Sequence, residues 1–156
     1  MKLLTVLPLL LFTGLVTAAE PAKLKFETYS GYFVSNKFEP KAATSFLTAG
    51  TQKQFDQVFG VAFVMGDQSR RLAPDAFKSQ LVLSAIRRGM AFCTYQVTSV
   101  TENDGVVQLR YKTTAKKSDS ASFSCPLIIS IPQGKYQAIE FHENNKLVKR
   151  LAIKKQ

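Results

Sequence analysis

Residues 91–112, AFCTYQVTSVTENDGVVQLRYK, have the clearest structural pattern in the chain. The two halves of this stretch alternate apolar and polar side chains with a period of two, which is typical of strands that bury one face. Asn103-Asp104-Gly105 separates the halves, and these residue types tolerate the positive φ of a tight hairpin turn. We therefore predict an antiparallel pair of strands with these inward side chains: Cys93, Tyr95, Val97, Val107, Leu109 and Tyr111.

The sequence on the C-terminal side continues as strands. Residues 123–131 place every second side chain, from Phe123 to Ile131, on one apolar face. Pro126 lacks a backbone N–H, which favours an edge position or a bulge. Residues 136–141 and 147–153 flank a polar turn at 143–146 and predict a last hairpin.

The N-terminal side predicts further strands and one helix. Thr51 is a candidate N-cap, and Gln54 is its capping-box partner. The helix would carry Phe55, Val58 and Phe59 on one face before it ends near Gly60. The predicted strands cover 24–34 with a bulge or close approach at Gly31, 45–48, 61–65 and 81–86, and a brief turn runs from Pro74 to Phe77.

These elements predict a mainly β fold, α+β at most: an antiparallel sheet or a small sandwich or barrel of about seven to nine strands, with one short helix packed on it. Residues 1–19 have the order of a secretory signal peptide, with Lys2, an apolar run and small residues up to Ala19. We expect cleavage there, a single domain over 20–156, and a secreted or periplasmic location. The alternative is an uncleaved segment that tethers the chain to a membrane.

Two cysteines, Cys93 and Cys125, would meet an oxidising compartment if the chain is exported, so a disulfide between them is expected. The alternative is two buried thiols that pack as small apolar groups. In a plain meander the two strands would lie about 10 Å apart, because neighbouring strands are spaced by about 4.8 Å. A disulfide therefore requires a different strand order.

The chain has 21 basic and 11 acidic residues, and loss of the segment with Lys2 leaves a formal charge of +9. This surplus favours anionic partners. The cations occur as scattered pairs, and a site for an anionic surface polymer would draw on Arg70, Arg71, Arg87, Arg88, Lys116, Lys117, Lys149 and Arg150.

No set of residues predicts catalysis, a cofactor or a metal site. His142 is the only histidine, so it is the sole candidate base for a hydrolase or a Cys-His pair, and both cysteines point into the predicted core. A zinc site from the cysteines and His142 would lack a fourth ligand. The many aromatic rings mostly alternate into the core, so nucleic-acid binding is not predicted.

Four short strings carry a resemblance: Tyr29-Ser30-Gly31-Tyr32, the helix of Phe55 to Phe59, Tyr95-x-Val97, and Pro126 to Pro132. Taken in this order, they resemble the small β-rich domain of bacterial protease-complex accessory subunits. The resemblance implies an exported bacterial domain that contacts other proteins, and it transfers no catalytic residues.

Together these observations lead to a hypothesis of a non-enzymatic interaction domain that binds another protein. The edge near Pro126 and the loop 66–75 are the expected contact regions, because loops and edges on a rigid scaffold often carry binding. The alternatives are a domain that binds an anionic surface polymer and an uncharacterised hydrolase.

Overall fold

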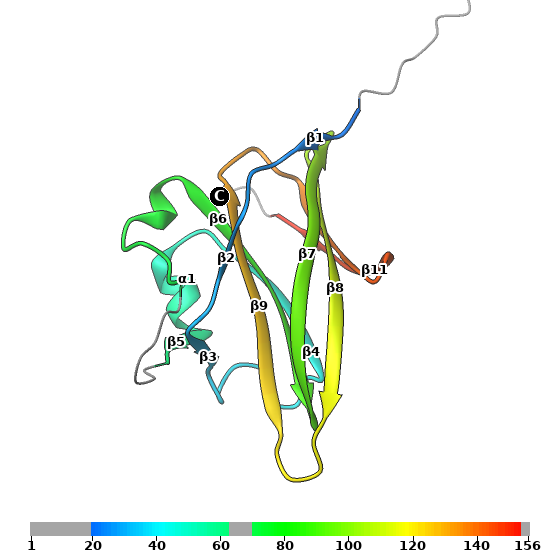
Figure 1. Cartoon of the computed structure of the whole chain (residues 1–156). Helices are drawn as coiled ribbons and strands as arrows, with labels where there is room; N and C mark the ends of the chain where they lie inside the picture. Colours follow the sequence, from blue (N-terminus) through cyan, green and yellow to red (C-terminus); the bar gives the residue numbers. More distant parts are fainter. Residues whose placement is uncertain (1–19, 63–69, 154–156) are drawn as a thin grey trace, which may run out of the picture.

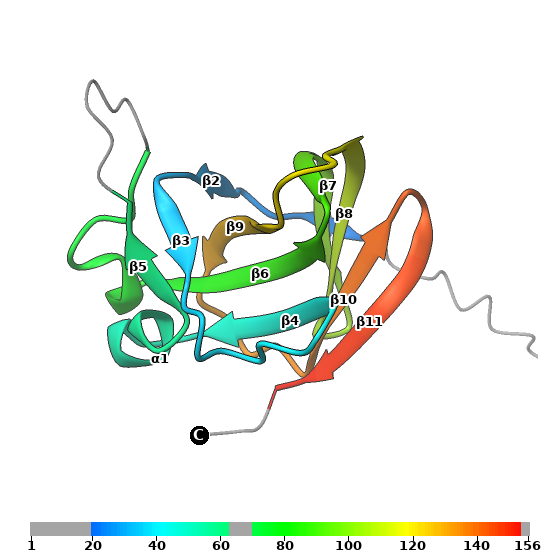
Figure 2. The ribbon, with the colours of Figure 1, turned by 90° about the horizontal axis from the view of Figure 1, so that it is seen from below.

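The computed structural model describes residues 20–62 and 70–153. Its strands form sheets of five, four and two strands, and the two larger sheets face each other without closing into a barrel (Figures 1 and 2). The predicted mainly β fold class is confirmed, in its sandwich form. The predicted signal peptide, most of the predicted strand 61–65 and the sequence 66–69 lie outside the described residues.

The five-stranded sheet, which we call sheet A, has the order β1-β7-β8-β10-β11. Its long strands β7 and β8 form the predicted hairpin, and the turn residues Asp104 and Gly105 have φ of 49° and 77°. β10 pairs with β8 in parallel, an exception to the predicted antiparallel pattern. The strand bounds are Ala22–Lys23 (β1), Ala91–Asn103 (β7), Val106–Lys117 (β8), Ala138–Glu143 (β10) and Lys146–Ala152 (β11).

The four-stranded sheet, sheet B, has the order β2-β9-β6-β4 and is antiparallel throughout. β9 follows β8 in the sequence but crosses to this second sheet, so the chain is not a meander. The strand bounds are Glu27–Tyr29 (β2), Thr44–Ala49 (β4), Gln80–Gly89 (β6) and Phe123–Pro132 (β9).

The main core lies between the two sheets. Sheet A contributes the predicted inward residues of β8, Val107, Leu109 and Tyr111, all with at most 2% of their surface exposed. Sheet B contributes alternate residues of β9, including Ile129 and Ile131. Because apolar residues of both sheets meet here, burial of this surface is the main force that holds the sandwich together.

A third layer covers the other face of sheet B. It consists of the helix α1 (Gln52–Asp56), the strand pair β3 (Tyr32–Val34) and β5 (Phe59–Val61), and a 3₁₀ turn (Ala76–Lys78). Phe55 of α1 packs with Val82, Ile86 and Ile128 of the sheet. The prediction of one short helix packed on a sheet is therefore confirmed.

The start of α1 agrees with the prediction, and its end does not. At its start, Thr51 Oγ1 accepts the Gln54 N–H at 3.3 Å, and Gln54 Oε1 accepts the Gly50 N–H at 2.8 Å. The helix ends at Asp56, however, so the prediction that Phe59 belongs to it is wrong. Phe59 begins β5, where a Cβ on Gly60 would lie 2.2 Å from the Phe33 ring, so the glycine leaves room for this ring across the strand pair.

The predicted strand 24–34 is divided into β2 and β3, β1 lies just before this range, and Gly31 has a φ of 76° before β3. The final hairpin is confirmed, and its turn residues Asn144 and Asn145 have φ of 50° and 68°, which is typical of a type I′ turn. Among residues 20–62 and 70–153, no helix is long and apolar enough to cross a membrane.

Candidate functional site between β7 and β9

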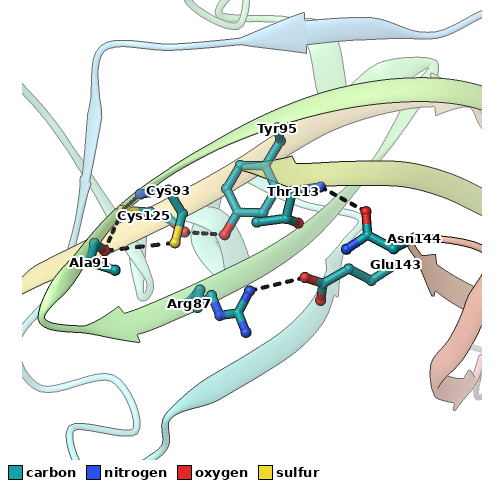
Figure 3. A network of polar contacts seen from close by, with 8 residues as sticks. All are labelled: Arg87, Ala91, Cys93, Tyr95, Thr113, Cys125, Glu143 and Asn144. Carbon is teal, nitrogen blue, oxygen red and sulfur yellow. Dashed lines mark hydrogen bonds and ion pairs between the residues drawn. The ribbon is translucent and has the colours of Figure 1, made fainter. Parts of the chain in front are cut away.

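The two cysteines lie side by side between β7 and β9 (Figure 3). The Cys93 N–H donates to Cys125 Sγ at 3.1 Å. Both sulfur atoms approach the carbonyl oxygen of Ala91, at 3.7 Å and 3.9 Å. Because β9 lies in the facing sheet, the two cysteine strands are not held apart by an intervening strand, as they would be in a plain meander.

Both cysteines are free thiols in this structure, so the predicted disulfide is not formed in it. Burial, and then the neighbouring Cys125, raise the pKa of Cys93 above its ordinary value. A raised pKa keeps the sulfur protonated at neutral pH, and a thiol is a poor nucleophile. This environment speaks against a catalytic role for Cys93.

A second set of polar contacts spans the two sheets beside the thiols (Figure 3). The Tyr95 hydroxyl donates to the Cys125 carbonyl oxygen at 2.9 Å, and Arg87 of β6 pairs with Glu143 of β10 at 3.0 Å. Burial raises the pKa values of Tyr95 and Tyr111 well above the ordinary range. These contacts join strands of opposite sheets and so have a structural explanation.

An open surface lies on the other side of the cysteine pair. β2 pairs with β9 only at residues 128–130, so within the described chain no strand pairs with residues 123–127 on that edge. Phe92 and Phe123 meet edge to face there, with ring centroids 5.6 Å apart. A hollow of about 290 Å³ adjoins them, lined by Tyr29, Ser30, Gly31, Tyr32, Phe92, Cys93, Phe123, Ser124, Cys125, Pro126 and Ile128.

We call this region the β7–β9 surface: the exposed Met90 and Phe92 with the half-buried Phe123 and Pro126. Phe92 is 51% exposed and Met90 is 48% exposed. The sequence signal for Phe92 was its even position on β7, which places it on the outward side with Thr94. The hollow has no such signal, because it depends on how β2 and β3 approach β9.

His142 lies away from the cysteines. It alternates with Phe141, whose ring is in the core, so the imidazole is on the outer side of sheet A. There His142 Nε2 is 3.2 Å from Glu140 Oε2, and Arg150 donates to Glu140 Oε1 at 2.9 Å. The structure does not bring His142 together with a cysteine. Among the described residues, no three His, Cys, Asp or Glu side chains could hold a metal ion.

The arginines of the basic pairs have local partners. Arg70 pairs with Glu27 at 3.1 Å, and Arg71 donates to the Ala62 carbonyl oxygen at 2.8 Å. Arg88 binds the carbonyl oxygens of Phe38 and Ala42 and, at 2.7 Å, Ser45 Oγ.

Three of the predicted anion-binding residues remain as solvated cations: Lys116 and Lys117 at the end of β8, and Lys149 on β11. None has an ion pair with a carboxylate of the described residues. The register places Lys116 opposite Phe92 and Lys117 opposite Ala91, so these two lysines adjoin the β7–β9 surface. Lys149 lies on the far edge of sheet A.

Comparisons with known proteins add no assignment. No family model matches the chain, and neither the curated proteins nor the solved structures contain a match.

Proposed function

We propose that this protein is a secreted or periplasmic, non-enzymatic interaction domain that binds another protein through the β7–β9 surface. The observation that carries the proposal is the half-exposed Phe92, which stands against Phe123 at a strand edge that no other described strand covers. Aromatic and methionine side chains are enriched at protein interfaces, because they bury a large area at a small entropic cost.

The setting of the aromatic pair supports a protein partner. The hollow beside it has room for a side chain, and the main chain of residues 123–127 borders it. Lys116 and Lys117 stand next to Phe92 in the ladder, which adds a positive rim. An apolar centre with a polar rim is the usual anatomy of a protein interface.

Export is part of the same proposal, and cleavage after Ala19 would release a chain that begins at Glu20. In an oxidising compartment, the adjacent thiols of Cys93 and Cys125 would be joined, which would tie β7 to β9 directly beneath the surface. Intact mass spectrometry with thiol labelling tests both points. A mass that includes residues 1–19 would contradict cleavage after Ala19, and thiols that label without reductant would contradict the disulfide.

Photocrosslinking tests the binding function. p-Benzoylphenylalanine at position 92 should trap a partner protein in cells that express the chain, as an adduct of one defined mass. The control places the same crosslinker at Lys53, an exposed residue of α1 on the third layer. Adducts from position 53 but none from position 92 would argue against the β7–β9 surface, and no adduct at either would argue against the function.

A second candidate function is binding of an anionic surface polymer, favoured by the exposed Lys116 and Lys117. Electrostatic binding weakens as salt rises, so retention on an acidic polymer column should fall steeply with ionic strength. The single substitutions K116E and K117E should each shorten retention more than K53E, which makes the same change of charge at an exposed lysine of α1. Equal losses of retention would mean that the net charge of the protein, and not a site at Lys116 and Lys117, causes the binding.

A further inference from the structure

β11 is an edge strand at the opposite side of sheet A from the β7–β9 surface. It pairs with β10 and with no other strand of the described chain. Six of its seven residues are exposed. An uncovered edge presents unpaired N–H and C=O groups, which are a template for another strand.

The direction of the backbone groups follows from one hydrogen bond. The Ile153 N–H donates to the Gln137 carbonyl oxygen at 2.8 Å, so the backbone of residue 153 faces the β10 side. Backbone groups of alternate residues in an antiparallel strand point to opposite edges. The N–H and C=O groups of Ala152 and Arg150 therefore point away from β10, toward an incoming strand.

The charge along this edge has one sign. β11 carries Lys146, Lys149 and Arg150 and no acidic residue. Arg150 and Glu140 of β10 neutralise each other, and Glu143 binds Arg87, so the net positive charge of this edge comes from Lys146 and Lys149. An approaching chain therefore meets a net positive edge, and complementary charge favours an acidic one.

Two exposed apolar side chains lie between these cations. Leu147 is 53% exposed and Val148 is 42% exposed, and a register shift in the ladder places Val148 as an extra residue opposite the Phe141 and His142 step. A second copy of this chain is a poor occupant, because antiparallel pairing of two β11 strands sets cations against cations. A partner that alternates acidic and β-branched residues fits both the charge and the apolar side chains.

We propose that the free edge of β11 binds an extended acidic segment of a partner protein as an added strand. The proposal rests on the proposed function only in taking the partner to be a protein, and it concerns a different surface. Main-chain hydrogen bonds supply the affinity in this mode, and charge supplies the selectivity. The opposing reading is that the lysines protect the edge from any strand, which predicts no binding at all.

The test uses three capped peptides and NMR of the folded protein. The first is Thr-Glu-Val-Glu-Val-Glu-Val-Thr, the second carries N-methyl groups at every second residue, and the third has Lys in place of Glu. We expect the first to bind and to slow hydrogen exchange of the Arg150 and Ala152 amides. N-methylation should weaken binding about tenfold or more, because it removes the ladder donors but no charge.

Variants locate the binding. Ala152→Pro removes an outward N–H without touching the β10 ladder, so it should abolish binding, whereas Ala152→Ser should keep it. Lys149→Glu should weaken binding by about fivefold or more, against no change for Lys53→Glu, because only the former lies on the edge. Unchanged melting of Ala152→Pro shows that the sheet is intact, and Lys149→Glu tests the edge independently if that variant fails to fold.

Several outcomes would overturn the proposal: equal binding of the N-methylated peptide, protection at residues other than those of β11, absence of binding at millimolar peptide, or concentration-dependent dimers that Ala152→Pro abolishes. Crosslinking from position 92 separates the two proposals. If position 92 still gives adducts in the Ala152→Pro variant, the β7–β9 surface binds a partner even when β11 binds no peptide. If position 92 gives no adducts, peptide binding to β11 stands as a separate result.

Discussion

The two large sheets differ in how many faces they bury. β6 of sheet B has an unbroken run of buried residues from Val82 to Ile86, because the main core lies on one side and α1 with β3 and β5 lies on the other. β8 of sheet A alternates buried and half-buried residues, because only one of its faces meets the core. Sheet B is therefore the middle layer of a three-layered molecule, and sheet A is an outer layer.

This difference bears on function. A sheet that is covered on both faces has only its edges and ends to offer a partner, whereas an outer sheet also offers a face. The β7–β9 surface lies where β2 no longer pairs with β9, so that this edge of sheet B is uncovered by the described strands. β11 is the free edge of sheet A. Both proposed contacts are edges, one apolar and aromatic, the other basic.

The largest expected effects separate the two cores. Phe141→Ala and Phe55→Ala each remove a ring that is at most 1% exposed, and each should cost about 3 to 5 kcal/mol of unfolding free energy. We expect Phe141→Ala to raise hydrogen exchange in both sheets, since the ring lies between them. Phe55→Ala should raise exchange mainly in α1, β3 and β5. Uniform loss of protection in Phe55→Ala would mean that the third layer is not a separable unit.

Arg88 provides the next largest effect, because it ties the chain before β4 to the end of β6. It donates to Phe38 O at 3.0 Å and to Ser45 Oγ at 2.7 Å. Arg88→Met should cost about 2 to 3 kcal/mol in urea unfolding, because it leaves these acceptors without a charged donor. The matched change Arg70→Met, at an exposed ion pair, should cost less than about 1 kcal/mol. Similar costs would contradict the structural role of Arg88.

The sequence predicted the elements that meet a single core. In β7 and β8, alternation identified the inward faces, and Asp104-Gly105 identified the turn, because these signals are local. It also located the start of α1 at Thr51. The end of α1 was predicted wrongly, because Phe59 and Gly60 pair with β3, a contact between segments distant in sequence.

Local sequence patterns could not predict the strand order or the candidate site. The parallel pairing of β10 with β8, and the position of β9 in the other sheet, follow from how apolar faces stack in three dimensions. The basic pairs read as one class in the sequence, yet Arg88 and Lys116 have opposite environments, since one is bound to carbonyl oxygens and the other is solvated. Partners of this kind come from tertiary structure alone.

Alkaline pH should weaken the contact between the two sheets. Burial raises the pKa values of Tyr95 and Tyr111 in the folded protein above the ordinary value of 10.0. A raised folded pKa gives stability that is fully present below pH 10 and is lost as pH rises toward the folded value. The melting temperature should therefore fall between about pH 10 and 11.5. The fall should be shallower in Tyr111→Phe, and an unchanged slope would exclude this tyrosine as a cause.

The smallest expected effect concerns the two hairpins of sheet A, which use the same turn type with different residues. Gly105 and Asn145 both have positive φ, at 77° and 68°, and only glycine adopts such a φ without a steric cost. Asn145→Gly should therefore stabilise the protein by about 0.5 kcal/mol in urea unfolding. Asn144 is left in place because its Oδ1 accepts the Thr113 N–H at 3.3 Å. The reverse change, Gly105→Asn, should cost more than Asn145→Gly gains, because its Cβ would lie 3.1 Å from the Gln137 side chain. Equal and opposite effects would mean that φ alone governs both turns and that Gln137 moves aside freely.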